Sequence, residues 1–261
     1  MENWWGEISF ELNEAKTWCI GQRRICVQRK SAEWLVWNEE TEDESFEELV
    51  LEEAVATDST INNLPQRYLV KNTQKCLTVK PLLANRSFII RPNSTLNILP
   101  GEQIELYVSS PLWLAFYDHG GSLPISDLPF WRPSDSWFGP NTMVGELCYS
   151  KYTEAKVTLD NISIHSHRAI TTISISNEHD ELLAIERISL PTPFLNLYVD
   201  ATHQFWTDKV NLIHHLDGYR PSFDIKNLIK ESAKTDLTLV SAAREVADAN
   251  TFMRSIKSLV A

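Results

Sequence analysis

Apolar and polar residues alternate in short runs along most of this chain, and this alternation constrains the fold more than any other feature. Ile8, Phe10 and Leu12 alternate with polar residues, and similar runs recur over residues 66–117 and 157–213. Successive side chains of a β-strand point to opposite faces, so this period of two indicates strands with one buried face. The runs are short, evenly spaced and separated by turn residues. We therefore predict an all-β protein made of antiparallel β-sandwich-like halves.

One segment interrupts the strand pattern and combines structure breakers with large rings. Residues 131–140 read Trp-Arg-Pro-Ser-Asp-Ser-Trp-Phe-Gly-Pro. Proline lacks an amide hydrogen and restricts the residue before it, so the two prolines argue against a helix or the interior of a strand. Burying the three large rings is favourable by about 25 cal/mol per Å² of apolar surface. We expect an ordered turning loop that is fixed to the body of the protein and joins the β halves.

The strand pattern and this segment divide the chain into four parts. We predict an N-terminal β half over residues 1–125, a central loop over 126–150, a C-terminal β half over 151–220 and a helical tail over 221–261. An acidic insertion at 38–58 interrupts the first half. Because the insertion lacks the ligand spacing of an EF-hand, a solvated loop is the expected structure.

Two turns and a change of period complete the expected secondary structure. Leu99-Pro100-Gly101-Glu102 is a proline–glycine turn that predicts a hairpin. The turn Asn177-Glu178-His179-Asp180, with an apolar strand on each side, is typical of the hairpins of immunoglobulin-like sandwiches. In the tail, apolar residues recur at intervals of three and four, which predicts an amphipathic helix over 241–259 and a shorter one near 225–233. The apolar stripe of the longer helix packs on its own domain or binds a partner or a second copy.

The residues of the central loop also carry a family resemblance. The sequence of residues 132–140, followed by Gly-Glu-Leu-Cys-Tyr at 145–149, resembles the signature of the DUF432 family of bacterial and archaeal proteins. Further matches are Trp4-Trp5-Gly6, Ile20-Gly21, Arg29 with Glu33-Trp34, Pro100-Gly101-Glu102, His167-Arg168-Ala169 and Leu190-Pro191.

The resemblance covers roughly residues 1–215 and has one internal departure, Gln22, where the family more often has proline. The tail beyond about residue 220 lies outside it, so we expect the tail to carry a feature of this protein alone. Members of the family are often encoded beside small mechanosensitive channel proteins. The resemblance therefore implies a channel of that kind as a partner.

Composition indicates a globular protein with an acidic surface. Hydrophobic residues make up 43% of the 261, and 35 acidic against 24 basic residues give a formal net charge of −11. This charge argues against a broad surface for nucleic acid or anionic membrane. The sequence has neither a secretion-signal pattern nor an apolar stretch that could span a bilayer, which predicts a cytoplasmic protein without membrane insertion. The four cysteines show no C-x-x-C spacing, and we expect buried, reduced thiols.

No motif of a familiar catalytic or cofactor site is present. Nucleophile-elbow, Walker and dinucleotide-binding motifs are absent, so we predict no cofactor, and the sequence does not indicate an enzyme. His165 and His167 form an H-x-H pair whose rings would share one face of a strand, and another histidine could join them around a metal ion. Ordinary surface or hydrogen-bonded histidines are the alternative.

Five residues of the central loop are the candidate binding residues: Arg132, Asp135, Trp137, Phe138 and Glu146. In the first hypothesis they form the contact surface of a non-catalytic interaction or regulatory protein. In the alternative, Asp135 and Glu146 flank a sugar or another small molecule beside the rings, as the carboxylates of a glycoside hydrolase do. A purely structural arrangement also fits the pattern, with Asp135 capping the loop and Arg132 paired with Glu146.

Overall fold

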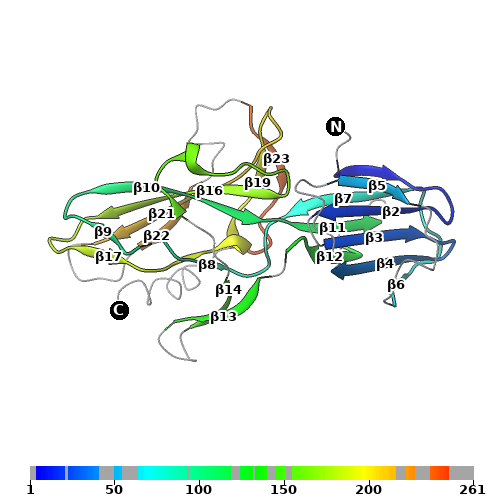
Figure 1. The fold of residues 1–261 in the computed structure, drawn as a ribbon, viewed down its shortest axis with the longest axis horizontal. Helices are drawn as coiled ribbons and strands as arrows, with labels where there is room; N and C mark the ends of the chain where they lie inside the picture. The colour runs from blue at the N-terminus through cyan, green and yellow to red at the C-terminus, as the bar shows by residue number, and fades with distance from the viewer. Residues whose placement is uncertain are drawn as a thin grey trace. The chain divides into compact units, whose positions relative to one another are not determined.

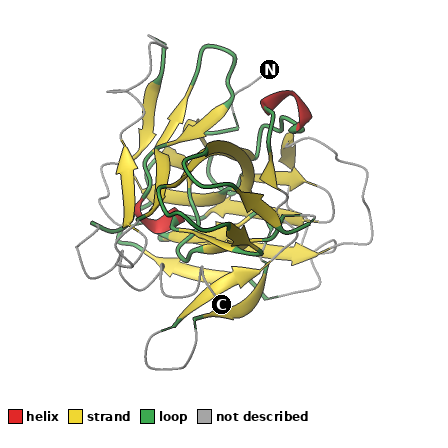
Figure 2. Ribbon diagram, turned by 90° about the vertical axis from the view of Figure 1, so that its left-hand side faces the viewer, coloured by secondary structure: helices red, strands yellow, loops and turns green. Residues whose placement is uncertain are grey.

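Strands dominate the structure. The computed structural model describes residues 4–20, 23–40, 50–54, 64–92, 94–118, 124–131, 133–139, 145–150, 155–215, 222–226 and 236–246. These residues form strands β1 to β23 and two short 3-10 helices, drawn in red in Figure 2. The predicted all-β class is confirmed. The chain divides into two compact units: unit 1 comprises Met1–Leu82 and Leu112–Trp131, and unit 2 comprises Leu83–Pro111 and Arg132–Ala261.

Unit 1 contains two antiparallel sheets (Figure 1). In order of hydrogen-bonded neighbours, the four-stranded sheet consists of β1 (Gly6–Ser9), β7 (Cys76–Leu82), β11 (Trp113–Asp118) and β12 (Ser126–Pro129). The five-stranded sheet consists of β5 (Val50–Ala54), β2 (Ala15–Ile20), β3 (Arg23–Arg29), β4 (Glu33–Glu40) and β6 (Gln66–Leu69).

Large aromatic side chains connect the two sheets of unit 1. Trp18 of β2 is fully buried, and its ring lies edge-on against Phe116 of β11 with the centroids 5.1 Å apart. Phe10 and Trp34 make a similar contact at 5.3 Å. The indole nitrogen Nε1 of Trp18 donates a hydrogen bond to the carbonyl oxygen of Trp4 at 2.7 Å, so this buried donor is satisfied. The alternating pattern therefore identifies residues of a real core.

The predicted acidic insertion is in part strand. Residues 38–40 belong to β4, and β5 pairs antiparallel with β2. Residues 41–49 and 55–58 lie outside the described part of the chain. The acidic composition did not predict β5, because an exposed glutamate such as Glu52 can face water while the backbone of its edge strand pairs.

The cysteines behave as expected from their spacing. All four are free thiols; Cys19, Cys26 and Cys148 are buried and Cys76 is half-buried. Burial, reinforced by the nearby Glu52 carboxylate, raises the pKa of the Cys19 thiol to about 11. This thiol is therefore protonated and unreactive at neutral pH.

The largest sheet of unit 2 is built around the long pair of β10 (Gln103–Pro111) and β16 (Arg168–Asn177). These strands are antiparallel from Gln103 opposite Ser176 to Pro111 opposite Arg168. The other members of the sheet are β15 (Ala155–Lys156), β19 (Leu197–Val199), β20 (Phe205–Thr207), β21 (Lys209–His214), β22 (Ser222–Lys226) and β23 (Thr238–Ser241).

Unit 2 also contains two smaller sheets and the two 3-10 helices. One sheet has the order β13 (Ser134–Phe138), β14 (Glu146–Ser150), β8 (Phe88–Ile90) and β18 (Ile188–Leu190). The other pairs β17 (Leu183–Ile185) with β9 (Leu96–Ile98). The helices are η1 (Leu159–Asn161) and η2 (Thr192–Phe194).

Several strand pairings in unit 2 differ from the prediction. β16 pairs in parallel with β20 and β21, and β14 pairs in parallel with β8. Both predicted turns form, and Gly101 takes the positive φ of 75° that the first one needs. Neither turn closes a hairpin, because β9 pairs with β17 while β10 and β16 pair with each other. The immunoglobulin-like hairpin expected around the second turn is therefore wrong.

Most of the predicted central loop is strand. β12, β13 and β14 all lie within residues 126–150, and β13 occupies the stretch between the two prolines. Pro133 comes directly before β13, at a sheet edge, where the missing amide hydrogen costs no ladder bond. Pro140 lies outside the described residues. The prediction that the two prolines exclude a strand here is therefore wrong, because β13 lies between them in the sequence.

The predicted amphipathic helix is not supported in the described part of the tail. Ser241 ends strand β23, which pairs antiparallel with β19, and residues 242–246 are not helical. In the range of the shorter helix, Ile225 and Lys226 belong to β22. Residues 227–235 and 247–261 lie outside the described chain. Pairing with strands distant in sequence overrides the local periodicity here.

Candidate functional site

Four of the five candidate residues of the central loop, Asp135, Trp137, Phe138 and Glu146, lie on a two-stranded ribbon formed by β13 and β14 (Figure 1). Trp137 is opposite Leu147, and Phe138 is opposite Glu146. Opposed residues of an antiparallel pair share a face, and successive residues alternate between faces. The ribbon therefore has a tryptophan face, made by Asp135, Trp137, Leu147 and Tyr149, and a phenylalanine face, made by Ser136, Phe138, Glu146 and Cys148.

The phenylalanine face fixes the ribbon to its own unit. Phe138 is 1% exposed and packs with Ile89 and Cys148. The Arg187 guanidinium lies 5.3 Å from the Phe138 ring centroid, a cation–π distance. Burial raises the pKa of the Cys148 thiol, and the Glu146 carboxylate raises it further, so the thiol stays protonated. Phe138 is an internal anchor and cannot stack on a ligand.

The Glu146 carboxylate is also used inside the unit. The Ser189 hydroxyl donates a hydrogen bond to Glu146 Oε1 at 3.1 Å, and the Cys148 thiol lies 3.5 Å from the same oxygen. Arg132 lies outside the described residues, so its expected pairing with Glu146 stays a prediction.

On the tryptophan face, Asp135 pairs with a residue distant in sequence. Asp135 Oδ1 accepts from Arg86 Nη1 at 2.9 Å, and the Arg86 guanidinium lies 5.5 Å from the Tyr149 ring centroid. The Tyr149 hydroxyl donates to Asn85 Oδ1 at 2.8 Å. Asp135 is therefore an ion-pair partner of Arg86. Because Asp135 and Glu146 point to opposite faces, they do not flank one ligand as the small-molecule hypothesis requires.

Two apolar side chains of the tryptophan face remain open to solvent. Trp137 is 40% exposed and Leu147, directly opposite, is 46% exposed. Gly145 lies against the Trp137 indole, since a Cβ added there would come within 2.5 Å of Trp137 Nε1. A Cβ on Gly139 would meet the Gly145 Cα at 2.3 Å. The two glycines let the strands approach closely and hold the indole in place.

A comparison with models of protein families identifies the family of this chain. Residues 4–258 match the model of the family described as "Protein of unknown function (DUF432)". The chain belongs to the DUF432 family. The match extends through the tail, so the expectation that the tail lies outside the family resemblance is wrong. No curated protein and no solved structure matches the chain.

The described residues of this DUF432 protein contain no helix that is long and apolar enough to cross a membrane. The predicted H-x-H pair, His165 and His167, lies before β16 and not within a strand. Their ring centroids are 5.4 Å apart. Within the described ranges, no group of three His, Cys, Asp or Glu side chains is arranged to hold a metal ion.

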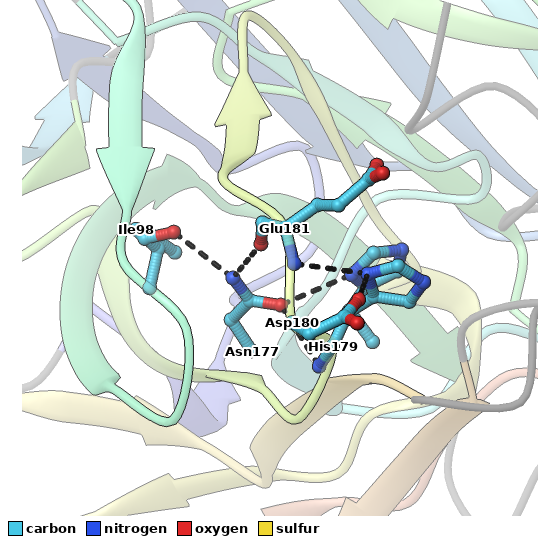
Figure 3. A network of polar contacts seen from close by, with 6 residues as sticks. Ile98, Asn177, His179, Asp180 and Glu181 are labelled. Atoms are coloured by element: carbon cyan, nitrogen blue, oxygen red, sulfur yellow. Dashed lines mark hydrogen bonds and ion pairs between the residues drawn. The ribbon is translucent and has the colours of Figure 1, made fainter.

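A polar network that the sequence analysis did not identify surrounds Asn177 at the end of β16. Figure 3 shows its amide between two chain segments: Asn177 Nδ2 donates to the carbonyl of Ile98 at 3.0 Å and to that of Glu181 at 2.8 Å. Asn177 Oδ1 accepts from the His179 amide at 3.2 Å and lies 3.1 Å from His214 Nδ1. Asn177 is 1% exposed. Its side chain thereby joins β9, the turn after β16 and β21.

Two histidines of this network stack on each other. The ring centroids of His179 and His214 are 5.0 Å apart. Burial, followed by the charges of His179 and His215, lowers the pKa of His214 from its ordinary value of 6.5. His179 Nδ1 accepts a bond from the Glu181 amide at 3.1 Å, and Asp180 Oδ1 lies 3.0 Å from the same nitrogen. The folded protein thus favours the neutral form of His214.

Acidification is expected to weaken this network. Because the folded state holds the pKa of His214 below 6.5, the unfolded chain binds more protons as the pH falls through 6.5. The stability that neutral His214 provides is complete above that pH and is lost below it. Urea unfolding at about pH 7.5 and about pH 5.5 should show a larger loss for the wild type than for His214→Gln, which cannot titrate. Equal losses in the two proteins would contradict the assignment.

Proposed function

We propose that this DUF432 protein is a non-catalytic interaction or regulatory protein of the cytoplasm, and that a partner protein binds the tryptophan face of its β13–β14 ribbon. The observation that carries the proposal is the exposed pair of Trp137 and Leu147 on a ribbon whose opposite face is anchored by buried Phe138. An exposed tryptophan in a fixed position is typical of the residues that dominate binding energy in protein interfaces.

The edge of β13 supports the same proposal. In the described part of unit 2, β13 has β14 on one side and no strand on the other. An open edge offers backbone donors and acceptors to an extended segment of another chain, while nearby side chains supply specificity. Trp137 is the fourth of the five residues of this edge strand. A partner strand added beside β13 would bring apolar side chains over Trp137 and Leu147.

The charge of the chain indicates the character of the partner. With a net charge of −11, this protein associates fastest with a surface or segment that carries positive charge. The partner therefore combines an extended segment, an apolar side chain and neighbouring lysine or arginine residues. The family resemblance implies a small mechanosensitive channel protein, whose cytoplasmic part is the first candidate to test.

Removing either member of the exposed pair is expected to weaken binding of the partner without unfolding the protein. Trp137→Ala and Leu147→Ala should each weaken retention of the channel protein by about tenfold or more, because anchors of this kind contribute about 2 kcal/mol or more. The measurement is a quantitative pull-down with the purified channel and with native cytoplasmic extract. Trp131→Ala is the matched control, since Trp131 is 47% exposed and lies outside the ribbon. Equal retention of all variants, or no stoichiometric partner from either source, would refute the proposal.

A further inference from the structure

Unit 2 also has a pocket with a mainly polar lining. A pocket of about 290 Å³ lies where the chain passes from β15 through η1 to β16. We call it the Arg168 pocket. Its polar lining residues are Ser109, Lys156, Asn161, Ser163, His165 and Arg168. Among the described lining residues, Lys156 and Arg168 are basic and none is acidic, although the whole chain carries a net charge of −11. The described lining therefore differs in charge from the protein as a whole.

Arg168 is the decisive residue because it is charged, half-buried and held in place, among the described residues, without a carboxylate. Its Nε donates to Ser109 Oγ at 2.8 Å, and its Nη2 donates to the Ser109 carbonyl oxygen. Burial alone lowers the pKa of Arg168, with no acidic side chain acting on it. Within the described residues, its side chain bonds only to Ser109. A guanidinium that is partly removed from water gains from pairing with an anion, and the described part of the chain supplies none to Arg168.

The geometry leaves donors available to a ligand. A guanidinium has five N–H groups, and the two bonds to Ser109 use two of them. The remaining donors belong to a side chain that is already oriented, so binding costs little side-chain entropy. The Ser109 and Ser163 hydroxyls can also donate a hydrogen bond to an oxyanion.

The wall of the pocket is fixed by apolar contacts behind it. Leu159 of η1 and Ile162 pack against the buried cluster of Ile170, Tyr198 and Trp206. The segment between β15 and β16 is therefore fastened to the large sheet. The pocket is preformed in the unliganded protein, as small-molecule sites usually are.

We propose that the Arg168 pocket binds a phosphate group, with Arg168 and Lys156 contacting its oxygens. The planar fork of arginine matches two phosphate oxygens, and a lysine supplies a second positive charge. The volume of about 290 Å³ exceeds what one phosphate fills, which favours a small molecule that carries the group. This site is separate from the β13–β14 ribbon, and neither proposal depends on the other.

Calorimetric titration of the full chain tests the proposal with three probes: inorganic phosphate, glycerol 3-phosphate and sodium chloride at matched ionic strength. We expect saturable binding of a phosphate probe and none of chloride. Tighter binding of glycerol 3-phosphate would identify an esterified phosphate as the ligand, and tighter binding of inorganic phosphate would identify the free ion. If neither phosphate probe binds more than chloride does, the proposal is overturned.

Variants locate the binding. Arg168→Gln and Lys156→Gln should each weaken phosphate binding by about tenfold or more, because each removes a charge-assisted hydrogen bond. Lys71→Gln removes the same unit of charge from an exposed position in unit 1 and should bind as the wild type does. Lys156→Gln remains informative if Arg168→Gln fails to fold. Wild-type affinity in Lys156→Gln, or an equal loss in Lys71→Gln, would show that the phosphate is not bound in this pocket.

Discussion

Replacing Trp18 with alanine is expected to destabilise unit 1 by about 3–5 kcal/mol, the cost of removing a large aromatic side chain from a packed core. Trp18 is completely buried, packs edge-on against Phe116 and donates a hydrogen bond to the Trp4 carbonyl. Alanine would leave a cavity between the two sheets and an unsatisfied carbonyl. Unit 1 has no helix among its described residues to cover either sheet, so the contact between the sheets is important for its core.

Urea denaturation followed by far-ultraviolet circular dichroism measures this loss. Trp131→Ala, at a position 47% exposed in the same unit, is the control and should change the free energy of unfolding by less than about 0.5 kcal/mol. A loss for Trp18→Ala no larger than that of the control would mean that the two sheets are not packed through this residue.

Asp208→Ala is expected to destabilise unit 2 by about 3–5 kcal/mol, because it removes the acceptor of three hydrogen bonds that each contribute up to about 1.5–3 kcal/mol. Asp208 is 1% exposed. Its Oδ2 accepts from the Asn196 backbone amide at 2.8 Å and from Asn196 Nδ2 at 2.7 Å, and its Oδ1 accepts from the Tyr198 hydroxyl at 2.7 Å. Alanine would leave these donors buried without an acceptor, and each would lose its hydrogen bond without regaining water.

Tyr198→Phe is the matched control for this network. It removes the hydroxyl that donates to Asp208 and leaves both bonds from Asn196 intact. We expect it to cost about 1 kcal/mol in the free energy of unfolding, measured by the same denaturation. If Asp208→Ala costs no more than Tyr198→Phe, the carboxylate is not the centre of the network.

The central loop shows what prolines and glycines in a short segment can predict and what they cannot. Two prolines and a glycine within ten residues predict turns, and they do bound a strand of five residues, Ser134–Phe138. Proline is excluded from a strand only where its position must donate a ladder hydrogen bond. An edge strand can therefore start directly after a proline. Whether a stretch lies at an edge depends on which strands pair with it, and the local sequence does not contain that information.

The candidate site was predictable in its residues but not in its arrangement. The sequence indicated that Trp137, Phe138, Asp135 and Glu146 lie together. Only the register of β13 with β14 separates them, exposing Trp137, burying Phe138 and turning the two carboxylates apart. A shift of one residue in that register would exchange the two faces.

The Arg168 pocket and the Asn177 network were missed because their members are distant in sequence. Ser109 and Arg168 meet through the pairing of β10 with β16, and Asn177 meets His214 through the parallel pairing of β16 with β21. The H-x-H pair with His165 and the family-like phrase His167-Arg168-Ala169 were signals at the pocket. They did not show that Ser109 holds Arg168 there.

By itself, the sequence determined the all-β class, the positions of many strands and the burial of three of the four thiols, because alternation and cysteine spacing act over a few residues. The strands expected over residues 157–164 do not form, and η1 lies there instead. The tertiary structure alone decided which strands pair, which of them are parallel, and which polar groups meet. Pairing is selected by the combined burial of apolar faces and the satisfaction of backbone hydrogen bonds across the whole unit. That balance involves residues more than a hundred positions apart, such as Arg244 and Leu83, and no local pattern encodes it.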